Sequence, residues 1–222
     1  MQSEISFFLR DCSFTAQHDD EDDRRLEPAT AGREEEAMQI GVNTWVWTSP
    51  FSTSDFHLIP KIKAMGFDLI EVALDDAATI DADLLRKSAA DNGLSISICG
   101  AFGPNRDISS DDPGVRQLGY DYIAGSIRFA EKVGSTLFSG PIYSAVGKTR
   151  LARPEQKARE RAWCVENMRA LGKVASDAGV TVGVEPLNRF ETNMINLAEQ
   201  AIALIEEVDH PGEPGEGEIV VR

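Results

Sequence analysis

The chain has 222 residues and 42% of them are apolar, so there is enough material for a packed core, which argues against wholesale disorder. The formal net charge is −15, and so acidic a surface argues against non-specific binding to nucleic acid or to an anionic membrane. The three cysteines are widely spaced and form neither a disulfide framework nor a CxxC metal site, which favours a reducing, cytoplasmic location.

The first 37 residues differ in character from the rest of the chain. They hold 11 acidic and 4 basic residues and show no apolar period that could bury a face. We expect a disordered acidic N-terminal extension, with a regulatory acidic arm as the alternative. No apolar run approaches the roughly 20 residues that span a bilayer, so no membrane segment is predicted.

From residue 38 onward, strand-like and helix-like segments alternate. Strands are predicted over residues 39–46, 67–74, 94–99, 136–139 and 180–185, and helices over 54–65, 81–92, 113–133, 154–178 and 197–208. A glycine follows each of the first four helices, which is a usual C-terminal stop. Asp112 and Pro113 suit the N-cap and the first position of the third helix.

This alternation predicts parallel strands joined by right-handed crossovers. A doubly wound sheet and a barrel both fit, but no GxGxxG follows the first strand, which counts against a dinucleotide-binding domain. We therefore predict an α/β fold, an incomplete (β/α)8 TIM barrel of about five βα units over residues 38–211. Residues 212–222 form an atypical Gly/Glu-rich tail in which 219–221 could begin a sixth strand. Five strands leave two open edges, so a homo-oligomer is possible.

The segment with most chemical information is VGVEPLNRFETNMIN, residues 182–196. Glu185 closes a strand, and in parallel α/β folds the active site lies at the carboxyl ends of the strands. A carboxylate there could bind Mg²⁺ or Mn²⁺, although it could also be solvated or paired with an arginine. Glu191 lies six residues further along, where it could face the same cavity.

The stretch from Gly183 to Glu191 resembles the ketose 3-epimerase family (D-tagatose and D-psicose 3-epimerases) within the xylose isomerase-like barrel superfamily. The likeness runs from about residue 40 to 211 and includes GFDLIE at 66–71 and VDHP at 208–211. The resemblance implies that Glu185 binds a divalent metal (Mn²⁺ or Mg²⁺, with Co²⁺ possible) and is one of two acid/base carboxylates. It also implies that Glu191 contacts the sugar.

The same resemblance places the sugar pocket on the loops after the first, third and fourth strands. The matching positions in this chain are Asn43, Trp47, Cys99, Gly100 and Tyr143. Each has a structural alternative: Trp47 and Tyr143 could be packed aromatics, and Cys99 could be a small buried residue. Asn43 departs from the aromatic residue that the family usually has there.

The resemblance implies epimerisation of a ketose at C3, by carboxylate proton exchange through an enediolate. The family's other metal ligands follow strands six to eight, which the sequence does not reach. We therefore expect a C-terminally truncated chain with weak or no activity. The alternatives are a non-catalytic sugar-binding or interaction remnant, or a hydroxypyruvate isomerase-like enzyme. A DNA-repair endonuclease of the same superfamily is disfavoured by the charge and by only three histidines.

Overall fold

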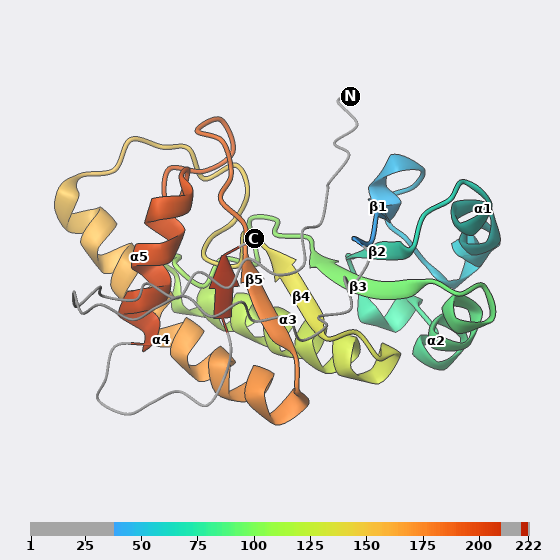
Figure 1. The fold of residues 1–222 in the computed structure, drawn as a ribbon. Helices are drawn as coiled ribbons and strands as arrows, with labels where there is room; N and C mark the ends of the chain where they lie inside the picture. Colours follow the sequence, from blue (N-terminus) through green and yellow to red (C-terminus); the bar gives the residue numbers. More distant parts are fainter. Residues whose placement is uncertain (1–37, 210–218, 222) are drawn as a thin grey trace, which may run out of the picture.

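The computed structural model describes residues 38–209 and 219–221, and Figure 1 shows the arrangement of the elements. The strands are β1 (Gly41–Asn43), β2 (Leu69–Leu74), β3 (Ser95–Gly100), β4 (Leu137–Gly140), β5 (Thr181–Val184) and β6 (Ile219–Val221). The α-helices are α1 (Ile59–Ala64), α2 (Ala82–Asp91), α3 (Pro113–Val133), α4 (Pro154–Ala178) and α5 (Ala198–Asp209). Three short 3₁₀ helices are η1 (Thr44–Val46), η2 (Thr53–Leu58) and η3 (Ala77–Thr79). The predicted extension over residues 1–37 and most of the predicted tail lie outside the described residues.

The strands form one parallel sheet in the order β1-β2-β3-β4-β5-β6, so each strand pairs with the strand that precedes it in the sequence. A doubly wound sheet would reverse its order at a switch point, whereas a barrel adds strands in sequence. The prediction of a partial barrel with parallel strands is therefore confirmed, and residues 219–221 pair with β5 as a sixth strand.

Two predicted elements differ most from the structure, whereas the bounds of the others agree to within two residues. The first strand was expected over residues 39–46 but covers only β1, because the Asn43 side chain accepts a hydrogen bond from the Trp45 amide and the chain turns into η1. The first helix begins as η2 and becomes α-helical only at Ile59, ahead of Pro60. The end of α3 agrees with the prediction, since Gly134 adopts a left-handed conformation with φ 81°.

One face of the sheet packs against the helices and forms the core. Side chains alternate along a strand, and the side chains of one set belong to the main hydrophobic cluster together with those of α1 to α5. From the strands this set includes Val42, Ile70, Val72, Leu74, Ile98, Phe138, Val182 and Val184. Among the described residues, no helix is both long and apolar enough to cross a bilayer.

Toward the carboxyl ends of the strands the other face carries small and polar side chains, and we refer to it as the polar face. Its register partners Asn43, Glu71 and Ser97 lie on neighbouring strands at one level. Cys99, Ser139 and Gly183 lie side by side at the next level toward the carboxyl ends. Most strand side chains of both faces are buried, but the two faces differ in chemistry.

Candidate active site at the carboxyl ends of the strands

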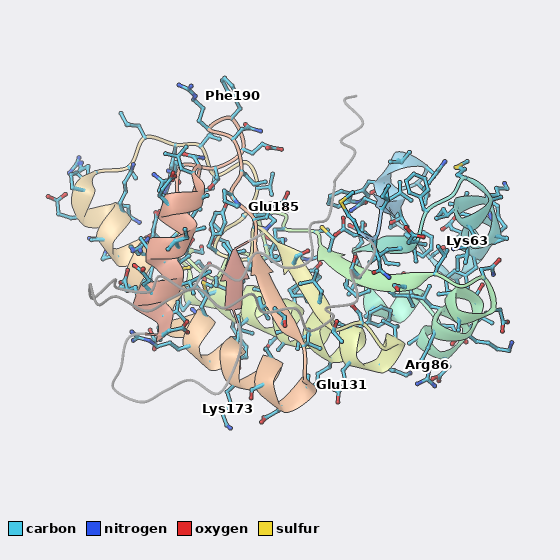
Figure 2. The ribbon with its side chains drawn as sticks, viewed as in Figure 1. Lys63, Arg86, Glu131, Lys173, Glu185 and Phe190 are labelled. Carbon is cyan, nitrogen blue, oxygen red and sulfur yellow. The ribbon has the colours of Figure 1, made fainter. Side chains whose placement is uncertain are left out.

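Glu185 is the first residue after β5, and its amide donates a hydrogen bond to the Gly140 carbonyl at 3.1 Å. This bond continues the β4–β5 ladder, so the alternation from Gly183 places Glu185 on the side of the polar face. The side chain is half-buried. Figure 2 shows it near the centre of the molecule, whereas Phe190 lies at the outer tip of the following loop. The sequence prediction of a carboxylate at a strand end thus agrees with this position.

Glu71 is a second carboxylate of the polar face, and sequence analysis did not select it as a site residue. It is buried in the middle of β2 and accepts a hydrogen bond from the Asn43 amide group, with 2.9 Å between Nδ2 and Oε2. A charged residue inside the apolar run LIEVAL was the available signal, because a buried carboxylate needs a specific partner. The Asn43 side-chain oxygen also accepts from the Trp45 amide and so caps η1. The NH₂ group and the oxygen of the Asn43 side chain therefore both have partners within the protein. A direct contact between Asn43 and a sugar stays a prediction.

The β5–α5 loop (residues 185–197) carries Glu191. Asn188 organises its tip: its carbonyl accepts from the Glu191 amide at 3.0 Å, and its side-chain amide donates to the Glu191 carboxylate. The Glu191 carbonyl accepts from the Gly147 amide at 2.7 Å. Glu191 is therefore half-buried on a loop that is attached to the β4–α4 loop (residues 141–153).

Tyr143 belongs to the β4–α4 loop and connects it to the β5–α5 loop through its hydroxyl. Its ring is 0% exposed, and its hydroxyl donates to the Ile195 carbonyl at 3.1 Å and accepts from the Leu187 amide at 3.3 Å. Burial raises the pKa of Tyr143 above its ordinary value, the Leu187 amide opposes this, and the charges of Glu185 and Glu191 raise it further. Both predicted carboxylates thus lie within electrostatic range of one buried hydroxyl. Tyr143 holds both ends of the β5–α5 loop, and its predicted contact with sugar stays untested.

The remaining predicted pocket residues lie in different environments. Trp47 is half-buried at the end of η1 and packs against the hydrophobic cluster. Cys99 is buried on the polar face. Gly100 lies next along β3 and belongs to the opposite face, the one that packs against the helices. A Cβ at this position would come within 2.4 Å of the Phe102 ring. Cys99 shares the side of Glu185 and Gly100 does not, and sugar contacts for all three residues stay predictions.

The donor set for a metal is incomplete in the described part of the chain. Protein sites for hard divalent cations combine several oxygen ligands. The described residues contain no group of three or more His, Cys, Asp or Glu side chains that could hold an ion. Glu185 can therefore supply one ligand, but the described residues alone do not fit a complete metal centre.

Comparison with known proteins agrees with the fold. Residues 59–212 match the model of the family described as xylose isomerase-like TIM barrel. Ketose 3-epimerase of Arthrobacter globiformis is 33% identical over 178 residues, which are 78% of this chain and 60% of that protein. L-ribulose 3-epimerase of Mesorhizobium japonicum is 33% identical over 173 residues, 76% of this chain and 56% of that protein.

Solved structures give the same relationship. A structure of L-ribulose 3-epimerase superimposes with a TM-score of 0.71 at 29% identity, covering 82% of this chain and 59% of that one. D-allulose 3-epimerase from Methylomonas sp. in complex with D-allulose gives 0.70 at 28% identity, covering 78% and 59%. The chain thus spans roughly three fifths of the length of these curated relatives. With its sequential parallel sheet and this family match over residues 59–212, the chain belongs to the xylose isomerase-like TIM barrel family.

Proposed function

We propose that this fold serves a sugar isomerase or epimerase reaction, the C3 epimerisation of a ketose, with Glu185 as an acid/base carboxylate. The observation that carries the proposal is the position of Glu185, directly after β5 and on the side of the polar face. Catalytic residues of these barrels lie at the carboxyl ends of the strands. The relatives named ketose 3-epimerase and L-ribulose 3-epimerase supply the reaction class.

The chemistry needs a base beside the carbon that is inverted. A carboxylate removes the C3 proton, which is acidic because C3 neighbours the ketone, and an enediolate forms. A second carboxylate on the opposite face of the sugar must return a proton, because one base alone would restore the original configuration. Glu185 would be one of these two groups, and Glu191 would hold a sugar hydroxyl.

A divalent cation, Mn²⁺ or Mg²⁺ with Co²⁺ as a third candidate, would supply a Lewis acid for the developing negative charge. Glu185 would be one of its ligands. Since the described residues hold no group of three ligand side chains, we expect weak metal binding and slow or no turnover by the 222-residue chain. The partner we propose is a small ketose rather than nucleic acid or membrane, in keeping with the charge of −15, and the location we propose is the cytoplasm. A homo-oligomer fits a sheet with open edges.

The incomplete donor set also supports a second candidate, a non-catalytic sugar-binding or interaction protein with this fold. The two candidates differ in their need for metal. Sugar binding that persists in excess chelator would favour the second. A hydroxypyruvate isomerase-like reaction is a further alternative. Assays with hydroxypyruvate beside the ketoses distinguish it from ketose epimerisation.

The test uses the purified 222-residue chain. Its Mn²⁺ binding is measured by titration monitored by electron paramagnetic resonance, and its activity by chromatographic assays with D-fructose, D-psicose and D-tagatose. We expect a Mn²⁺ dissociation constant of about millimolar or weaker, in the range of the weakest oxygen-ligand sites, and its loss in Glu185→Gln. Glu206→Gln is the matched control, because Glu206 is an exposed glutamate of α5. Equal Mn²⁺ binding or epimerisation by Glu185→Gln and the wild type would remove Glu185 from the proposal.

A further inference from the structure

Lys148, in the β4–α4 loop, is a nearly buried cation outside the residues considered so far. It exposes 10% of its side chain, and its ammonium donates to Asp107 Oδ2 at 2.9 Å, Ser109 Oγ at 2.8 Å and the Ser109 carbonyl at 3.1 Å. Three acceptors match the three protons of an ammonium group. Lys148 is therefore anchored in one orientation on the β3–α3 loop (residues 101–112).

A second buried acid completes this anchor. Glu160 of α4 exposes 3% of its side chain and lies 3.6 Å from the Lys148 ammonium. Its Oε1 accepts from both terminal nitrogens of Arg150, at 3.0 and 2.5 Å, and from Gln156 at 2.9 Å. Asp107 is similarly buried and accepts from the Ser109 amide at 2.9 Å. Buried charges that are paired and hydrogen-bonded in this way have a single well-defined geometry.

The backbone around Lys148 contacts a different segment, the β5–α5 loop. Lys148 and Thr192 form a parallel β-bridge. The Gly147 amide donates to the Glu191 carbonyl at 2.7 Å, and the Lys148 carbonyl accepts from the Asn193 amide at 2.9 Å. The Gly147 amide and the Lys148 carbonyl thus hold the Glu191 carbonyl and the Asn193 amide in register, on either side of Thr192.

We propose that Lys148 is a positioning residue for Glu191: its ammonium is fixed by Asp107, Ser109 and Glu160, and its backbone fixes residues 191–193 over the carboxyl end of the sheet. The role of the positioned carboxylate as a sugar contact rests on the proposed function. The positioning itself does not, because it concerns the register of two loops. Tyr143 holds the β5–α5 loop at Leu187 and Ile195, whereas the middle of that loop contacts the β4–α4 loop through the bridge between Lys148 and Thr192. Two side-chain hydrogen bonds add to this contact, one between Ser144 Oγ and Thr192 Oγ1 at 3.2 Å and one from Asn193 Nδ2 to the Arg150 carbonyl at 2.5 Å.

The first test is amide hydrogen exchange of the full chain, read by NMR without ligand. In Lys148→Met the amides of Gly147 and Asn193 should exchange about tenfold faster, the loss expected when one hydrogen bond is weakened. The amides of β4 and β5 should keep their wild-type rates, and Lys148→Arg should restore part of the protection. Lys157→Met is the control, because Lys157 is an exposed lysine of α4. Unchanged exchange at Gly147 and Asn193 in Lys148→Met would overturn the proposal.

A milder variant covers the case in which Lys148→Met does not fold. Ser109→Ala removes one acceptor of the ammonium, at 2.8 Å, and leaves both acids in place. The amides of Gly147 and Asn193 should exchange about threefold faster, a smaller increase than in Lys148→Met. The amides of β4 and β5 should keep their wild-type rates. Wild-type protection of both amides in this variant would count against the positioning role.

A binding measurement links the loop to the site. In Lys148→Met the Mn²⁺ affinity should match the wild type, because Glu185 belongs to the β5 end, while the D-allulose concentration for half-saturation should rise about tenfold. A parallel loss of Mn²⁺ and sugar binding would show a general defect and contradict positioning. If the wild type itself binds no ketose, the proposed function fails, and the exchange experiment still decides the role of Lys148.

Discussion

The α-carbon of Gly119 in α3 lies against the amide of Asp107, and a Cβ at this glycine would come within 2.9 Å of the Asp107 nitrogen. It would also approach the Ile108 nitrogen and the Arg106 carbonyl carbon at 3.1 Å each. The helix and the β3–α3 loop are therefore in direct backbone contact. This contact places Asp107 where its carboxylate accepts a hydrogen bond from the Lys148 ammonium.

Gly119→Ala should destabilise the protein by about 1–3 kcal/mol, because backbone atoms cannot move aside as the end of a side chain can. Gly125→Ala in the same helix is the control: nothing lies within 4 Å of its Cβ position, and alanine should stabilise by up to about 1 kcal/mol through helix propensity. Urea unfolding followed by circular dichroism measures both. Shifts of the same sign and size in the two variants would contradict the close contact at Gly119.

Tyr143→Phe should lower the free energy of unfolding by about 1 kcal/mol, since it removes the bonds to Leu187 and Ile195 and leaves the ring in place. The loss is moderate because the Leu187 amide keeps a second acceptor, the Ile195 carbonyl, at 3.1 Å. Tyr120→Phe is the matched control, a half-buried tyrosine of α3 packed against the hydrophobic cluster. Thermal unfolding compares the two, and an equal effect in both variants would argue against the hydroxyl link.

Tyr122 should make stability fall at alkaline pH. Its hydroxyl donates to the Leu74 carbonyl and accepts from the Ala101 amide, and burial raises its pKa from 10.0 to about 12. In the unfolded chain it ionises near pH 10, so the folded state retains a proton that the unfolded state releases. The contribution to stability is complete below about pH 10 and is lost as the pH rises toward about 12. Urea unfolding between about pH 9 and pH 11 should show a steeper decline for the wild type than for Tyr122→Phe, and parallel declines would refute this assignment.

Cys164 should be unreactive while the protein is folded. The side chain is 0% exposed on α4, and burial raises the pKa of its thiol above the ordinary value. The reactive thiolate is therefore scarce and shielded. Alkylation with iodoacetamide near neutral pH, followed by peptide mass spectrometry, should label Cys164 only after denaturant is added. Rapid labelling of Cys164 in the native protein would show that this part of the core opens.

The sequence by itself determined the elements and their order, because those signals are local. The Asp112 cap, Gly134 and Gly179 mark helix ends through the conformation of a few neighbouring residues, and the structure confirms all three. The strand-end position of Glu185 was predictable for the same reason. Only the tertiary structure decided which strand residues share the polar face, since the phase of alternation is set by pairing with neighbouring strands. It also brought Lys148 to Asp107, 41 residues earlier in the chain, a contact that no local pattern encodes because it depends on how two loops pack over one sheet edge.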